Sequence, residues 1–191
     1  VLGRLTISSL DGDTDGDGDI DQIVAYGGRS FSIWKADGTL VYDSGDEFEQ
    51  ITAQRVPEIF NSNGDPDSFD SRSDNKGPEP EGVTVGQFNG RTLAFIGLER
   101  VGGVMIYDIT DPANAFFVNY TPQLPEDISP EGLLYISADE SPTGVPLFVT
   151  TNEISGTTTV YEVVPEPGTI LGLLSAAGAA GLGLKRKRRT A

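Results

Sequence analysis

Apolar residues occur along most of the chain in short runs rather than in long helical stripes. The runs are rich in Val, Ile, Thr and aromatic residues, and Gly, Pro, Asn or Asp stands at their ends. This pattern is typical of β-strands joined by turns, and no stretch before the C-terminal tail keeps the period of an amphipathic helix. We therefore predict an all-β body, with strands near residues 22–26, 30–34, 39–42, 92–97, 103–109, 146–151 and 157–163.

The predicted strands recur with a period near 50 residues. Pro80-Glu81-Gly82 and Pro130-Glu131-Gly132 open two similar units, and a weaker third copy covers residues 23–34, with Trp34 in the position of Tyr107. Three or four short strands per repeat predict β-propeller-like blades, and three blades do not close a ring, so we expect a fragment of a larger propeller. A β-sandwich cut from a longer protein is the alternative. The matching strand segments are 95–99 with 149–153 and 104–109 with 158–163.

The end of the chain differs from the rest. Residues 169–184 are uncharged and rich in Gly, Ala and Leu, and residues 185–189 are all Lys or Arg. An apolar run of this length is at the short edge of what spans a bilayer as a helix, with the basic cluster on the cytoplasmic side. We therefore predict a C-terminal hydrophobic helix, and contact with the membrane through residues 168–184 before processing. A buried C-terminal helix with a basic end is the alternative.

Val164-Pro165-Glu166-Pro167, the apolar run and the basic cluster follow one another in the order of the PEP-CTERM signal, which the tail resembles. The resemblance implies recognition by an exosortase-type sorting enzyme, cleavage near Pro-Glu-Pro and an exported product in the cell envelope, at the cell surface or outside the cell. We expect a body at residues 1–163 and a sorting segment at residues 164–191 that takes no part in the fold. Because no N-terminal signal peptide is present, we also expect the chain to begin within a longer gene product.

The amino-acid composition excludes several classes of catalytic and metal-binding site. The 191 residues include no His and no Cys, which excludes disulfides, thiolate or imidazole metal ligands, cysteine nucleophiles and Ser-His-Asp triads. The formal net charge is -16, and we expect no nucleic-acid partner because phosphate binding requires a positive surface. Any bound metal must therefore be held by oxygen ligands.

The most distinctive chemistry lies in an acidic loop at residues 11–21. Read from Asp13, the loop has the pattern D-x-D-x-D-G-x-x-D, in which alternate carboxylates project toward one centre and Gly18 permits a sharp turn. Oxygen ligands at this spacing suit Ca²⁺, and the loop resembles the calcium loops of integrin-type FG-GAP propeller blades. We expect Ile20 to point into the core as an anchor. The predicted Ca²⁺ ligands are Asp13, Asp15, Asp17, Asp19 and Asp21.

Two alternatives remain open for this acidic loop. A second register begins at Asp11 but misplaces the apolar anchor Ile20. The loop can also be a solvated acidic turn that binds no ion, although the mutual repulsion of its clustered carboxylates argues against this. If Ca²⁺ binds, we expect a structural role for it rather than a catalytic one.

The repeat also places four glutamates at equivalent strand ends. In a propeller such positions gather near the axis, so we consider a site for a cation or cationic ligand at a channel mouth, or a metal-dependent hydrolytic centre. We favour the alternative that these side chains cap backbone amides and pair with arginines as braces between blades, because a residue repeated in each blade is more often structural. The residues are Glu81, Glu99, Glu131 and Glu153, with Arg29 and Arg100 nearby.

Five sequence segments together resemble the C-terminal portion of the choice-of-anchor I family. They are residues 27–34, 48–52, 76–82, 97–103 and 152–157. The resemblance runs from about Gly3 to Val163, implies an exported β-propeller and supplies no established activity. We therefore predict a calcium-stabilised propeller of the cell envelope with a binding or matrix role, and favour a non-enzymatic protein. A calcium-dependent phosphoesterase resembling alkaline phosphatase, with the glutamate cluster and Arg100 at its centre, is the alternative.

Overall fold

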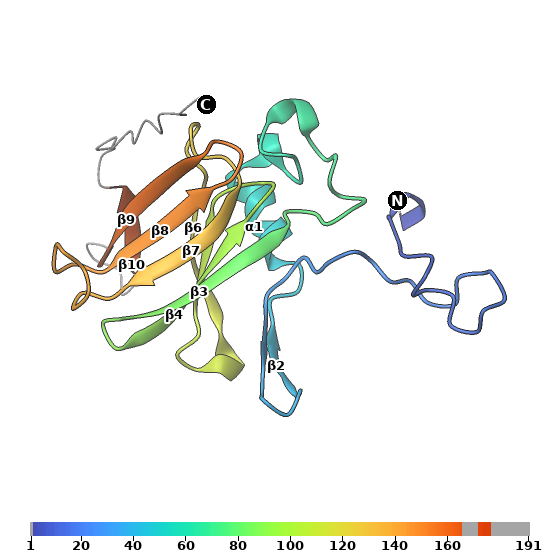
Figure 1. Ribbon diagram of the computed structural model, residues 1–191, viewed down its shortest axis with the longest axis horizontal. Helices are drawn as coiled ribbons and strands as arrows, with labels where there is room; N and C mark the ends of the chain where they lie inside the picture. The colour runs from blue at the N-terminus through green and yellow to red at the C-terminus, as the bar shows by residue number, and fades with distance from the viewer. Residues whose placement is uncertain (1, 166–171, 177–191) are drawn as a thin grey trace, which may run out of the picture.

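The computed structural model describes residues 2–165 and 172–176, in which strands form two four-stranded sheets and one two-stranded hairpin (Figure 1). In each four-stranded sheet the strands follow one another antiparallel in chain order, so each is a meander. The first sheet consists of β3 (Pro80–Phe88), β4 (Arg91–Leu98), β5 (Val104–Asp108) and β6 (Phe116–Thr121). The second sheet consists of β7 (Pro130–Ile136), β8 (Leu147–Asn152), β9 (Thr157–Pro165) and β10 (Gly172–Ala176). The prediction of a mainly β body is confirmed.

The internal repeat is visible in the strand pairing. Pro80 pairs with Leu98 at the start of the first sheet, and Pro130 pairs with Asn152 at the start of the second. In both sheets the register shifts directly after this first pair, which marks an irregularity at the same place. The two repeat units found in the sequence therefore have the same strand pairing, with a register shift at the same place.

The third copy does not form a four-stranded sheet. Its one strand among the described residues is β1 (Ser32–Trp34), which forms a hairpin with the following strand β2 (Leu40–Asp43). Residues 22–26 are not a strand, and an isolated bridge joins Ile7 to Ala25. This N-terminal segment extends away from the two sheets (Figure 1). A short apolar segment without a neighbouring surface to cover it gains too little from pairing alone to form a stable ladder.

Apolar side chains pack against both faces of the first sheet. On one face Phe95 stacks on Phe148 of the second sheet, with ring centroids 4.7 Å apart, in a cluster that also includes Ile106. On the other face Phe48 and Tyr107 belong to a second cluster, and Phe48 comes from helix α1 (Glu47–Arg55). The first sheet is therefore covered on both faces.

Helix α1 was not expected from the sequence. Its buried residues Phe48 and Thr52 lie one turn apart, and the helix is nine residues long, which is too short to display a sustained helical period. Single 3₁₀ turns occupy Leu2–Arg4, Pro57–Ile59, Pro66–Ser68 and Pro112–Asn114.

The C-terminal prediction needs correction. Residues 172–176 form strand β10, which pairs antiparallel with β9, so the predicted hydrophobic helix is wrong for these residues. An open edge of β9 would leave backbone groups unpaired, and pairing with β10 satisfies them. The rest of the predicted helix and the basic cluster lie outside the described residues. Within the described part of the chain, every helix falls short of the length and hydropathy that a membrane span requires.

Candidate functional site

The acidic loop brings three of its predicted ligands together. Carboxylate oxygens of Asp13, Asp15 and Asp21 lie within 4.8 Å of one another. The loop backbone aligns Asp13, because the amides of Gly16 and Gly18 donate to its two oxygens at 2.7 and 3.0 Å. Both glycines have left-handed φ values, 82° and 97°, which glycine adopts without steric cost. The glycines in the motif therefore position the carboxylates.

Asp21 closes the loop. Its carboxylate accepts hydrogen bonds from the amide and the hydroxyl of Thr14, both at 2.9 Å, and its own amide donates to the Gly12 carbonyl at 2.9 Å. The Thr14 amide, followed by the Thr14 hydroxyl, holds the pKa of the Asp21 carboxyl below its usual range, because both hydrogen bonds favour the ionised form. A carboxylate has about four acceptor positions, so the three aspartates keep acceptor capacity for a hard cation beyond these bonds.

The remaining acidic residues of the loop lie differently. Asp17 accepts the amide of Asp19 at 3.0 Å, and neither of these predicted ligands joins the group of three. Asp11 accepts the hydroxyl of Ser8 at 2.7 Å, outside that group as well. Ile20 is 41% exposed, so the prediction that it points into the core is wrong, because the N-terminal segment extends away from the sheets that the structure describes (Figure 1).

The four predicted glutamates lie at corresponding strand ends of the two sheets. Glu81 and Glu131 are the second residues of β3 and β7, while Glu99 and Glu153 directly follow β4 and β8. The starts of β3 and β7 touch, since a Cβ on Gly82 would lie 2.7 Å from the Glu131 carbonyl oxygen. The glutamates differ in exposure: Glu99 is buried, and the other three are exposed. Among the described residues, carboxylates that converge in threes occur in the acidic loop and not here.

Glu99 has a mixed environment. Arg100 Nη2 lies 2.7 Å from its carboxylate. Burial raises the pKa of Glu99, a hydrogen bond with Glu81 raises it further, and the Arg100 charge opposes both. The two carboxyl groups therefore act as a pair in which Glu99 keeps its proton to a higher pH than an ordinary glutamate.

The main concentration of charge surrounds Glu79, which the sequence analysis missed. Glu79 is 5% exposed and forms ion pairs with Arg72 and Lys76, and its carboxylate lies 3.4 Å from Arg100 Nε. These contacts attach the long loop before β3 to the start of the first sheet. The predicted pairing of Arg100 with strand-end glutamates is thus observed for Glu99, and Arg100 also reaches Glu79.

A comparison within the repeat shows which part of this cluster is unique. The counterpart of Glu79 in the second sheet is Ser129, and both have left-handed φ values, 58° and 69°. Each carbonyl accepts the amide that follows the neighbouring strand, at 2.8 Å. The backbone hydrogen bond is therefore present in both copies, whereas the charged side chain at this position, Glu79, occurs only in the first copy. The sequence signal that could have identified Glu79 is this difference between the two copies.

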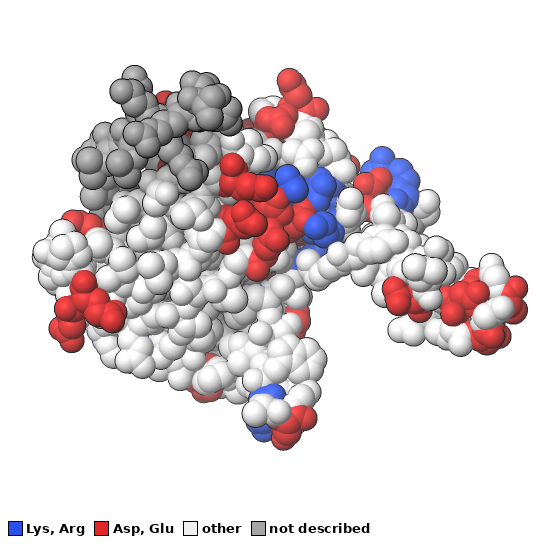
Figure 2. Space-filling model, viewed as in Figure 1, with Lys and Arg blue, Asp and Glu red and all other residues white. Residues whose placement is uncertain are grey.

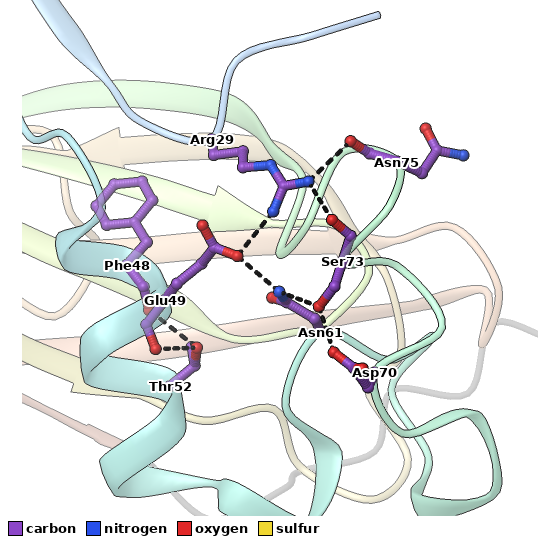
Figure 3. Close-up of polar contacts among 8 residues, drawn as sticks. All are labelled: Arg29, Phe48, Glu49, Thr52, Asn61, Asp70, Ser73 and Asn75. Atoms are coloured by element: carbon purple, nitrogen blue, oxygen red, sulfur yellow. Dashed lines mark hydrogen bonds and ion pairs between the residues drawn. The ribbon is translucent and has the colours of Figure 1, made fainter. Parts of the chain in front are cut away.

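Arg29 lies in another network (Figure 3). It donates to the Glu49 carboxylate at 2.8 Å and to the carbonyls of Ser73 and Asn75 at 2.6 and 3.1 Å. Glu49 also accepts a hydrogen bond from the amide of Asn61 at 2.6 Å. Arg29 therefore braces the N-terminal segment against α1 and the following loop, and it is paired with Glu49 rather than with the strand-end glutamates.

Charge is unevenly placed on the surface. Figure 2 shows acidic side chains gathered beside basic ones in the middle of the face, and a second acidic group on the protruding N-terminal segment. The central group is a mixed patch in which charges offset one another. The protruding group has no such basic neighbours on the face shown, which favours attraction of cations from solution.

Two family descriptions match the chain. One, the Choice-of-anchor I domain, matches residues 1–112, and the other, the PEP-CTERM protein-sorting motif, matches residues 163–189. The domain match lies at the N-terminal side of the chain, which corrects the expectation of a C-terminal portion extending to Val163. The sorting motif lies where it was predicted and implies recognition by an exosortase-type enzyme.

Two curated proteins are similar over most of the chain. Gigasin-3a of Magallana gigas is 32% identical over 185 residues, which cover 85% of this chain and 65% of the relative. Mesenchyme-specific cell surface glycoprotein of Strongylocentrotus purpuratus is 32% identical over 181 residues, which cover 87% of this chain and 22% of the relative. The chain thus spans less than two thirds of either relative. No solved structure matches it.

Proposed function

The chain belongs to the choice-of-anchor I family, and from this premise we propose that it is a calcium-stabilised propeller section with a binding or structural role outside the cell. The family domain and the sorting motif mark it as an exported protein of the cell surface. The name of one relative, a cell surface glycoprotein, agrees with a surface role.

The observation that carries the proposal is an apolar row on the outer face of the second sheet. Leu134 pairs with Val149, which pairs with Val160, and Leu134 and Val160 are 55% and 42% exposed. The first-sheet counterparts of Val149 and Val160 are Phe95 and Ile106, which are 1% exposed because the second sheet covers them. The second sheet therefore has apolar residues where the repeat places a neighbouring sheet, which supports stacking of further sheets as in a propeller.

Ca²⁺ is the cofactor that the acidic loop fits. Asp13, Asp15 and Asp21 supply converging carboxylates, which are hard ligands suited to Ca²⁺. A cation there would offset the repulsion between these side chains and join the two ends of the loop. We assign it a structural role, because the loop lies on the protruding N-terminal segment, away from β3, which begins directly after Glu79 (Figure 1).

Calorimetric titration of the full chain with CaCl₂ tests this proposal, with MgCl₂ as the comparison ion. We expect wild type to bind Ca²⁺ and Asp13→Asn/Asp21→Asn to bind it at least about tenfold more weakly, because two of three charged ligands become neutral. The exposed pair Asp67→Asn/Asp139→Asn has the same change in net charge and should bind like wild type. Equal binding by the loop variant and wild type would contradict the assignment.

An assay for hydrolysis of an aryl phosphate separates the structural role from the phosphoesterase alternative. We expect no turnover with or without Ca²⁺, since phosphoryl transfer relies on cationic groups and here Arg72, Lys76 and Arg100 already pair with glutamates. Turnover by wild type that disappears in Glu99→Gln would instead favour the enzyme.

A further inference from the structure

The sorting motif supplies strands to the folded body. It begins at Val163, a core residue that is 2% exposed, and it includes β10. Strand β10 pairs with the last five residues of β9, from Gly172 opposite Pro165 to Ala176 opposite Tyr161. On its other side β9 pairs with β8. One edge of β9 is thus occupied by β8 and the other by part of the sorting motif.

This pairing has the properties of a releasable contact. Without β10, the edge of β9 would present unpaired N–H and C=O groups, which form a ready docking site for an extended peptide. Pairing with β10 satisfies them, but it extends over five residue pairs only. Gly172 and Ala176 also have low strand propensity, so the strand adds little stability of its own.

Pairing with β9 and use of the motif at a membrane exclude each other. The extended backbone of β10 in its pairing with β9 cannot at the same time have the dihedral angles and intrahelical hydrogen bonds of a membrane-spanning helix. Glu166 and Pro167 of the sorting motif lie in sequence between the two paired strands. Engagement of the apolar run by a bilayer therefore requires release of β10.

We propose that the edge of β9 is a docking site for β10, a part of the protein's own sorting segment, and that β10 must leave β9 before a membrane can engage it. The proposal rests on the strand pairing and on the sorting motif, and it does not depend on Ca²⁺ binding or on a complete propeller.

Disulfide trapping in the full chain tests the docking. The chain has no Cys, so Glu162→Cys/Ser175→Cys introduces the sole pair, at positions that are opposite each other in the register. Opposed residues of antiparallel strands have Cα atoms about 4.5–5.5 Å apart, within disulfide range. The control Thr158→Cys/Ser175→Cys moves one partner four residues along β9, roughly 13 Å. Under mild oxidation of dilute protein, we expect the registered pair to close at least about tenfold faster than the control. Equal rates would overturn the docking.

Vesicle binding tests the release. Vesicles of phosphatidylethanolamine and phosphatidylglycerol are added to the Glu162→Cys/Ser175→Cys protein after oxidation and again after reduction. We expect the locked form to bind at least about tenfold less than the reduced form, because the lock holds β10 on the sheet. Restoration of binding by reduction distinguishes locking from misfolding. Equal binding of both forms would overturn the requirement for release.

Discussion

The first and second sheets share strand order and pairing, yet they lie in different surroundings. The first is covered by the second sheet on one face and by α1 and its neighbours on the other. The second is covered on one face, and its outer face exposes Leu134 and Val160. Strand pairing thus follows the local sequence repeat, whereas burial depends on what packs against each face.

The two sheets also differ in the surroundings of their charged residues. Glu79 is buried among cationic side chains in the first sheet, and Ser129 takes its backbone position in the second. Glu99 is buried beside Arg100, whereas its counterpart Glu153 is exposed. A repeated position can therefore have a repeated backbone role and a side-chain role that differs between copies.

The largest expected effect is at the contact between the sheets. Phe148→Ala removes a fully buried ring that stacks on Phe95, and we expect a loss of about 3–5 kcal/mol in the free energy of unfolding. Leu134→Ala, on the exposed face of the same sheet, should change it by no more than about 0.5 kcal/mol. Urea unfolding measures both. Similar losses in the two variants would contradict the assignment of inner and outer faces.

A second prediction concerns the close approach of β3 and β7. A Cβ at Gly86 would overlap the ring of Tyr135, so we expect Gly86→Ala to lower the free energy of unfolding by about 1–3 kcal/mol. In a double-mutant cycle with Tyr135→Ala, the combined loss should be smaller than the sum of the single losses, because the clash disappears with the ring. Additive losses would show that the two sites do not touch.

The third prediction addresses Glu79 and its counterpart. Glu79→Gln keeps the size of the side chain and removes its charge, and we expect a loss of about 1–2 kcal/mol, moderated because Lys76 and Arg100 are partly exposed. Ser129→Ala should be within about 0.5 kcal/mol of wild type, since the Ser129 hydroxyl has no hydrogen-bond partner and the backbone is retained. Chemical unfolding at neutral pH compares them. Equal losses would show that the side-chain roles do not differ.

The smallest expected effect is on the pH dependence of the free energy of unfolding. The pKa of Glu99 is raised in the folded protein, chiefly by burial and then by Glu81, so the folded state binds the proton more tightly than the unfolded state. The stabilisation from this proton is present at low pH and is lost as pH rises from the ordinary glutamate pKa through the raised one. Glu99→Gln should remove this loss. As pH rises, the free energy of unfolding of the variant should therefore fall less than that of wild type.

Urea midpoints measured between about pH 4 and pH 8 give this profile for both proteins. Glu153→Gln, at the exposed counterpart in the second sheet, is the matched control and should follow the wild-type profile. An unchanged profile in Glu99→Gln would show that another group dominates this range.

The candidate sites were partly predictable. The spacing of Asp13, Asp15 and Asp21 indicated convergence, because a short glycine-containing loop constrains its own carboxylates. Glu79 and the Arg29 pairing with Glu49 were not predicted, since Arg100 and Glu49 are distant in sequence from their partners and meet them only after the loop before β3 packs on α1 and the first sheet. The Ca²⁺ assignment stays a prediction that the titration checks.

The sequence by itself determined most of the strand segments, the two-copy repeat, the convergence of Asp13, Asp15 and Asp21 and the place of the sorting motif. These features depend on alternation, turn residues and short spacing, which act within a few residues. Tertiary structure alone decided that residues 23–34 do not complete a third sheet, that Glu99 is buried while Glu153 is exposed, and that residues 172–176 pair as β10. Each of these outcomes depends on whether a neighbouring surface is available to bury a side chain or to bond a backbone edge.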